Sequence, residues 1–217
     1  MEYLKGADEQ ALKEDSYWLS RYYEFQAREL ERQGRIHEAA ELWRRYAELK
    51  YSKGSYLLSA LGFLNAALLL EREDVEKACQ LLVDGLKKVE EKLPPMMVVL
   101  LYGQAARIAG RKDPLLAAEC YERLGELMER QERFFEAADA YEHASEFLMV
   151  GGRDIRGYTK PGEIWMRNAE MWMEKKELDD AEWSAVRALK YFEFIGDYEG
   201  AERARQLMEK ISVEEGS

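Results

Sequence analysis

The stretch Tyr121–Ala144, YERLGELMERQERFFEAADAYEHA, decides the fold of this chain. Apolar and small side chains recur in it at spacings of three and four residues, which places them on one face of a helix. Two such patterns occur, and the polar segment ERQER at positions 129–133 separates them without any apolar anchor. The stretch therefore predicts two helices joined by a short turn.

Large and small residues alternate on both predicted helical faces. The first face is formed by Tyr121, Leu124, Gly125 and Met128, and the second by Phe134, Ala137, Tyr141 and Ala144. A bulky ring on one helix can then pack over a Gly or Ala of its neighbour. Close-packed antiparallel helices are the expected product.

This pattern resembles the tetratricopeptide repeat, a helix-turn-helix unit of 34 residues. In that family an aromatic residue and a Leu-Gly pair on the first helix precede Ala, an aromatic residue and a second Ala on the second. The positions that match are Tyr121, Leu124, Gly125 and Met128, then Ala137, Tyr141 and Ala144. The family's terminal Pro is missing. The resemblance implies an all-α fold, a right-handed α-solenoid of antiparallel hairpins with about ten helices, in a single domain over residues 1–217.

Other segments repeat the pattern with longer hairpins. Ala39, Ala78 and Ala117 recur at equal intervals that exceed the standard unit, which is similar to the soluble NSF attachment protein branch of the superfamily. A first helical segment is expected within residues 8–33, and Gly34 is a left-handed helix stop. Asp113-Pro114 is expected to cap and open a helix. Leu61-Gly62 resembles the Leu-Gly pair, one turn out of register.

The composition favours helices and a protein partner. Ala, Leu, Glu, Lys and Arg dominate, and the net charge is −11. That charge works against nucleic-acid binding, which needs clustered cations. The apolar run Tyr56–Leu70 is shorter than the roughly 20 residues that span a bilayer, so it predicts a buried solenoid helix and no membrane insertion. A cytoplasmic location is expected, and the shortage of Asn beside abundant Glu, Lys and Arg is typical of thermophile proteins.

No pattern of catalytic or metal-binding residues emerges. Cys79 and Cys120 lack CxxC pairing and are expected to be buried, reduced thiols. His37 begins a segment close to the zinc-protease motif HExxH, but Glu41 replaces the second His. We therefore expect no enzyme, no cofactor and no metal.

The resemblance also implies which residues line a concave groove for a partner. They are Glu122, Arg123, Glu126 and Glu129 in one unit, Met166, Arg167, Glu170 and Met173 in another, and Arg21, Glu24 and Arg28 in the earliest. Some family members grip a chaperone's terminal carboxylate with Lys and Asn, where this chain has Glu122 and Glu126. Acids beside flexible Met side chains favour a basic or amphipathic helical peptide. The leading hypothesis is therefore an adaptor that binds another protein.

Two alternatives remain open on the sequence. The first is a self-assembling homo-oligomer whose interface is formed by Trp165, Trp172 and the apolar helices. The second is a sensor of a small anionic ligand in the irregular segment 149–162, where Arg153, Arg156 and Lys160 could hold a carboxylate or phosphate.

Overall fold

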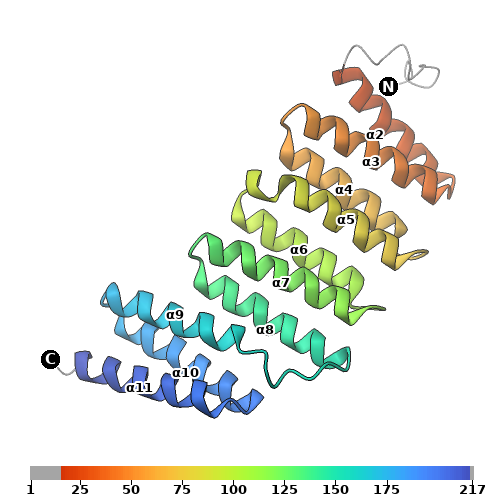
Figure 1. Cartoon of the computed structure of the whole chain (residues 1–217). Coiled ribbons are helices and arrows are strands. Elements are labelled where there is room, and N and C mark those ends of the chain that lie inside the picture. Colours follow the sequence, from red (N-terminus) through yellow and green to blue (C-terminus); the bar gives the residue numbers. More distant parts are fainter. Residues whose placement is uncertain (1–15, 216–217) are drawn as a thin grey trace. The chain divides into compact units, whose positions relative to one another are not determined.

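The computed structural model describes residues 16–215, and within that range the chain forms ten α-helices and no β-strand (Figure 1). The all-α prediction is thus confirmed. Residues 8–15 of the predicted first segment lie outside the described residues. The helices are α2 (Ser16–Arg32), α3 (Ile36–Ser52), α4 (Tyr56–Leu70), α5 (Val75–Val89), α6 (Pro95–Ala109), α7 (Pro114–Arg130), α8 (Phe134–Val150), α9 (Lys160–Glu174), α10 (Leu178–Ile195) and α11 (Tyr198–Glu215), with a short 3-10 turn η2 (Glu90–Lys92) after α5.

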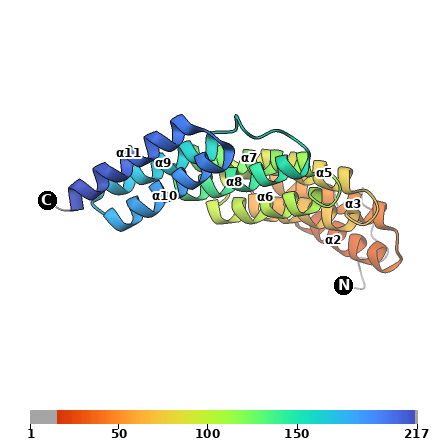
Figure 2. The same cartoon turned by 90° about the horizontal axis from the view of Figure 1, so that it is seen from below.

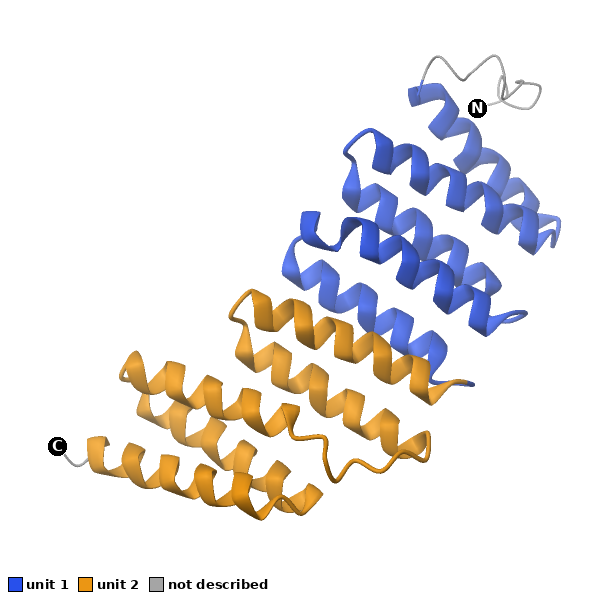
Figure 3. Ribbon diagram, in the orientation of Figure 1, with its two compact units in different colours: residues 1–112 blue, residues 113–217 orange. Residues whose placement is uncertain are grey.

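The helices fall into two compact units (Figure 3). Unit 1 covers residues 1–112 and contains α2 to α6, and unit 2 covers residues 113–217 and contains α7 to α11. The expectation of a single domain over the whole chain stays a prediction, and so does the right-handed superhelix.

Within each unit, consecutive helices run antiparallel and alternate helices form two layers. In unit 1, α3 and α5 form one layer, and α2, α4 and α6 form the other (Figures 1 and 2). In unit 2, α7, α9 and α11 lie in one layer, with α8 and α10 in the other. The contacts between helices are mainly those between chain neighbours, and α9 also touches α11. This is the solenoid-like arrangement that the sequence predicts.

The helix cap, the helix stop and the turn that the sequence predicts are found at the expected residues. The Asp113 carboxylate accepts a hydrogen bond from the Leu116 N–H at 3.0 Å and so caps α7, and Pro114 takes the first helical position. Gly34 ends the turn after α2 with a φ of 72°. The turn predicted at 129–133 lies between α7 and α8, where Glu132 has a φ of 58° although it is not glycine.

Glycine and aromatic rings bring the helices together. An added Cβ at Gly125 of α7 would lie 2.8 Å from the ring of Tyr141 on α8, so the ring rests on the bare backbone. Gly85 of α5 and Phe63 of α4 make the same contact, with a Cβ only 2.3 Å from the ring. The packing of a large ring over a small residue, predicted from the sequence, is confirmed. The out-of-register Gly62 faces the preceding helix instead, since its Cβ would lie 2.9 Å from Ala47 of α3.

The apolar helix α4 is less buried than its sequence suggests. No helix in the described part of the chain is long and apolar enough to cross a membrane. However, α4, predicted as a buried helix, leaves the leucines on one of its sides exposed. Seven of the 15 residues of α4 are buried, so the side of the helix that faces the core is buried as predicted and the opposite side is not.

Substituting Gly85 with Ala tests the ring-on-glycine contact. The added methyl would overlap Phe63, a buried ring without room to move, so the free energy of unfolding should fall by about 1–3 kcal/mol. Gly103→Ala is the matched control, because a Cβ there meets nothing within 4 Å in α6. The control should gain about 0.5–1 kcal/mol from helix propensity. Urea unfolding of both variants measures the difference, and equal effects would contradict the packing described.

Candidate functional site

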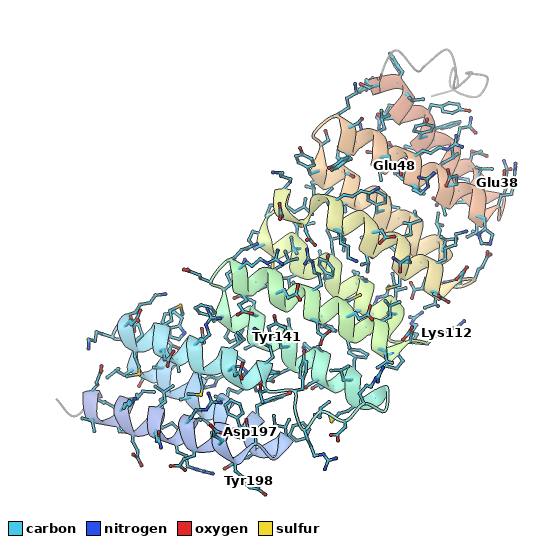
Figure 4. All side chains as sticks on the ribbon, viewed as in Figure 1. Glu38, Glu48, Lys112, Tyr141, Asp197 and Tyr198 are labelled. Atoms are coloured by element: carbon cyan, nitrogen blue, oxygen red, sulfur yellow. The ribbon has the colours of Figure 1, made fainter. Side chains whose placement is uncertain are left out.

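A polar hollow of about 540 Å³ lies between α7 and α9 in unit 2. Tyr141 of α8 contributes to its lining from the other layer, and its position is labelled in Figure 4. Tyr158 comes from the connection between α8 and α9. The complete set of lining residues is Glu122, Glu126, Glu129, Arg130, Tyr141, Tyr158, Lys160 and Arg167. Five of these, Glu122, Glu126, Glu129, Lys160 and Arg167, were predicted as site residues from the sequence.

Helical spacing explains why α7 is the acidic wall. Glu122, Glu126 and Arg130 are four residues apart, so they lie above one another on one face of the helix. The connection after α8 carries Tyr158 to the hollow and ends in α9, which begins at Lys160 and brings Arg167 two turns later. Ile155, with 8% of its surface exposed, anchors that connection in the core.

Glu129 is the central charge of the hollow. Lys160 Nζ lies 2.9 Å from Glu129 Oε2, and Arg167 donates to Glu129 Oε1 at 2.5 Å. The hydroxyl of Tyr141 donates to the same carboxylate at 3.3 Å. Burial by itself would raise the pKa of Glu129, but the hydrogen bond and charge of Lys160 and the charge of Arg167 outweigh it, so the pKa lies below its ordinary value. Glu129 is therefore ionised and holds α7, α8 and α9 together.

The two tyrosines stay protonated. Burial raises the pKa of Tyr141, and the neighbouring Glu129 carboxylate raises it further. Burial likewise raises the pKa of Tyr158, with Glu122 adding to the effect. Both hydroxyls therefore keep their protons at neutral pH; that of Tyr141 donates to Glu129, and that of Tyr158 is buried without a hydrogen-bond partner. The ammonium group of Lys160 also lies 5.5 Å from the centre of the Tyr141 ring, a cation–π distance.

Glu122 and Glu126 are the acids that the hollow can offer to a ligand. Arg123 lies 3.2 Å from Glu126, whose side chain is half exposed, and Arg130 lies 3.9 Å away. Such exposed pairs are weak and exchange readily. No described Lys or Arg forms an ion pair with Glu122, which faces Tyr158. A cation that entered the hollow would therefore meet one carboxylate without a cationic partner and a second that is loosely held.

The other predicted groove residues lie outside this hollow. Met166 and Met173 are half-buried and pack against a core cluster formed by α9, α10 and α11, which includes Ala169 and Leu207. Glu170 is exposed on α9 and does not line the hollow. Arg123 is also outside its lining, although it reaches Glu126. The Met side chains thus contribute to the packing of the last three helices.

The three cations of the predicted anion site are not brought together as one cluster. Arg156 forms a bidentate pair with Asp154, and this pair lowers the pKa of Asp154 to about 2. Lys160 binds Glu129 in the hollow, and Arg153 is exposed. Within residues 16–215 no group of three or more His, Cys, Asp or Glu residues could hold a metal ion.

A second polar centre lies between α8 and α10. The indole N–H of Trp165 donates to Glu142 Oε1 at 2.5 Å, and Arg187 pairs with the other oxygen. Burial raises the pKa of Glu142, although the Trp165 hydrogen bond and the Arg187 charge oppose this. Trp165 is only 1% exposed, so its predicted place in an oligomer interface was wrong. The exposed rings beside it are Phe135 and Trp183, which stack with centroids 5.8 Å apart.

Sequence reasoning missed Tyr158 and Arg130 as members of the hollow. Arg130 was taken as part of a solvated turn, and four-residue spacing from Glu126 is the signal that would have found it. Tyr158 lies in an irregular connection without periodicity, so its side chain carried no such signal.

Comparison with known proteins does not assign the chain to a family. No family model matches the sequence, and no curated protein does. The chain is similar in structure to BtubC (BKLC) from P. vanneervenii, with 16% identity and a TM-score of 0.38 over 95% of this chain and 93% of that one. A chain of the DHF58 filament matches with 20% identity and a TM-score of 0.20 over 91% of both. Both scores are too low to carry an argument about fold or function.

Glu129→Gln tests the central charge of the hollow. The variant should lose about 1 kcal/mol of unfolding free energy at pH 7, because the hydrogen bonds to a charged acceptor weaken. Since folding lowers the pKa of Glu129, its contribution is present above the unfolded pKa of about 4.3 and disappears as the pH falls through the folded pKa. The difference between wild type and variant should therefore shrink below about pH 4.

Urea unfolding across this pH range makes the measurement. Glu126→Gln is the control on the same helix, because its carboxylate is half exposed and its loss should change stability little at any pH. A difference for Glu129→Gln that stays constant down to acid pH would contradict the assignment.

Proposed function

We propose that this chain is a non-enzymatic protein-interaction module of the tetratricopeptide-like type, and that the hollow between α7 and α9 receives a basic, amphipathic helix of a partner protein. The observation that carries the proposal is the pair of acids on one face of α7. Glu122 has no cationic partner among the described residues, and Glu126 has only exposed, weakly held ones.

The size and rigidity of the hollow support this reading. A volume of about 540 Å³ is within the range of ligand pockets, and it can hold one or two long side chains. Its walls are rigid, because Glu129 is fixed from α8 and α9 and the Tyr141 ring rests on Gly125. A pre-formed site loses little conformational entropy when a ligand binds.

The absence of a reacting group supports a binding role over catalysis. The tyrosines of the hollow have raised pKa values, so neither is a nucleophile or base at neutral pH. Glu129 is fully engaged by two cations. Lys and Arg side chains of a partner fit these surroundings, because carboxylates are their preferred acceptors. A cytoplasmic location and a thermophilic source remain predictions from the sequence.

A pair of synthetic helical peptides tests the proposal. One has Lys at every third or fourth position beside an apolar face, and the other has Glu at the same positions. Only the Lys peptide should bind, and Glu122→Lys together with Glu126→Lys should weaken its binding at least about tenfold, since close charge pairs contribute 1.4 kcal/mol or more. Fluorescence anisotropy of the labelled peptide measures the dissociation constant.

The control separates the hollow from the overall negative charge. Glu202→Lys together with Glu209→Lys changes the net charge equally, but both residues lie exposed on α11. This double variant should bind the Lys peptide nearly as well as wild type. Equal losses for the two double variants would mean non-specific attraction to an acidic chain and would overturn the proposal.

A further inference from the structure

A second pocket of unit 2 lies between α8 and α10, in the layer that does not contain α7 and α9 (Figure 2). We call it the α8–α10 pocket. Its volume is about 260 Å³, compared with about 540 Å³ for the hollow between α7 and α9. This volume lies just below the range of pockets that hold drug-sized ligands, so the pocket suits a smaller molecule and not a helix.

Apolar side chains from both helices line the α8–α10 pocket. Met149 comes from the last turn of α8 and is 39% exposed, and Phe194 comes from the last turn of α10 and is 61% exposed. Tyr191, three residues before Phe194, is only 7% exposed, and the centres of these two rings lie 6.4 Å apart. A ligand that covers Met149 and Phe194 gains free energy, because apolar surface is then removed from water.

The two acids of the pocket already interact with donors of the chain. One oxygen of Glu142 accepts from the indole N–H of Trp165 at 2.5 Å, and the other accepts from Arg187. The Arg187 guanidinium is therefore engaged as well. Glu146 lies 3.2 Å from Nδ1 of His143 on the same helix.

The two hydroxyls that line the pocket are also engaged. The hydroxyl of Ser145 donates to the carbonyl oxygen of Glu142 at 2.7 Å. The hydroxyl of Tyr191 donates to the carbonyl oxygen of Tyr158 at 3.0 Å. Neither hydroxyl has its proton free for a ligand.

Lys190 is the polar side chain of the pocket that has no hydrogen bond or ion pair with any residue in the described range 16–215. Glu193, the acid three residues later on α10, accepts from Arg205 of α11 at 2.6 Å. The residues one turn before and one turn after Lys190 are Val186 and Phe194, which carry no charge. The ammonium group of Lys190 is therefore available to a ligand beside an apolar wall.

One available cation next to apolar side chains defines the chemistry of the occupant. It has to bring one negative charge for Lys190 and an apolar body for Met149 and Phe194. We propose that the α8–α10 pocket binds a small carboxylic acid, whose carboxylate pairs with Lys190 and whose aromatic or aliphatic body packs against Phe194 and Met149. An Asp or Glu side chain of a partner protein matches less well, since it has at most two methylene groups to cover the apolar wall.

The net charge of −11 does not prevent an anion from binding. Exposed charges that lie more than about 8 Å apart are largely screened at physiological ionic strength, so the groups within the pocket decide. There Glu142 and Arg187 neutralise each other. Glu146 remains as the opposing charge, and its side chain is 65% exposed to water, which weakens its repulsion. This proposal goes beyond the proposed function, since it concerns a small molecule and the other layer of unit 2.

Two probes of equal size test the proposal on the full chain. Phenylbutyrate has a carboxylate and an apolar body, and phenylbutanamide carries a neutral amide in place of the carboxylate. Proton–nitrogen correlation spectra during titration give both the affinity and the place of binding. Phenylbutyrate should shift the amide signals of Met149, Lys190 and Phe194 with a dissociation constant in the millimolar range or below. Phenylbutanamide should bind at least about threefold more weakly, because it forms no ion pair.

Substitutions separate the charge from the apolar wall. Lys190→Gln should abolish the difference between the two probes, and Phe194→Ala should weaken both of them about three- to tenfold. Both residues are exposed, so circular dichroism should show an unchanged helix content. Lys210→Gln is the matched control, because it removes the same charge from an exposed position on α11 outside the pocket. It should leave both dissociation constants unchanged.

Several outcomes would overturn the proposal. One is equal binding of the two probes by wild type, and another is the lack of a saturable shift at these signals up to about 10 mM of phenylbutyrate. Equal weakening by Lys190→Gln and Lys210→Gln would mean a general attraction to cations. A peptide that ends in Phe with a free carboxylate tests a protein partner in the same pocket. If this peptide binds and phenylbutyrate does not, the occupant is a chain terminus and the proposal of a small acid is wrong.

Discussion

The structure depends on aromatic rings that rest on glycine backbone. Phe63 on Gly85 and Tyr141 on Gly125 are two cases, and Phe192 is held between Gly162 of α9 and Gly200 of α11. Each contact allows two helix backbones to approach more closely than any larger residue would permit. A cation covers the free face or edge of each ring: Lys88, Lys160 and Arg203 lie 5.6, 5.5 and 5.7 Å from the three ring centres. The packing inside a unit and the polar lining above it are therefore built by the same side chains.

The two units use this common packing for different surfaces. In unit 2 the ring of Tyr141 lines a hollow whose walls carry charges of both signs. In unit 1, helices α4 and α6 expose Leu and Met side chains, and Glu71, directly after α4, pairs with Arg107 and Arg111. Polar walls select a partner by charge and hydrogen bonds, whereas an aliphatic surface offers only its shape. One chain thus carries two surfaces of distinct chemistry.

The structural features that depend on residues close together in the chain were predicted from the sequence. The cap at Asp113, the stop at Gly34 and the contact between Gly125 and Tyr141 depend on neighbours along one or two helices, and all were found as predicted. Long-range placement could not be predicted. The pair of Glu129 and Arg167 joins positions 38 residues apart, and the irregular connection between α8 and α9 determines whether they meet.

Burial was predicted least well, because it depends on how many neighbours a helix has. The apolar pattern of α4 predicted a buried helix, and Leu57, Leu61 and Leu68 are nevertheless partly exposed. Trp165 shows the opposite error, since the surrounding rings and Glu142 enclose a residue that the sequence had assigned to the outer surface. Met166 and Met173, which the sequence assigned to a groove, are half-buried and pack against the cluster around Ala169.

The preference of each helix for its chain neighbours has a consequence for biosynthesis. Contacts that are short-range in sequence give fast folding, because little chain entropy is lost before they form. As the polypeptide leaves the ribosome, each new helix of a unit can dock on the preceding helix of that unit, with no need to wait for the carboxyl terminus. The side chains that these helices bury against one another, such as Phe63 and Leu70 of α4, would then be shielded early, which limits the time during which chaperones or proteases could capture them.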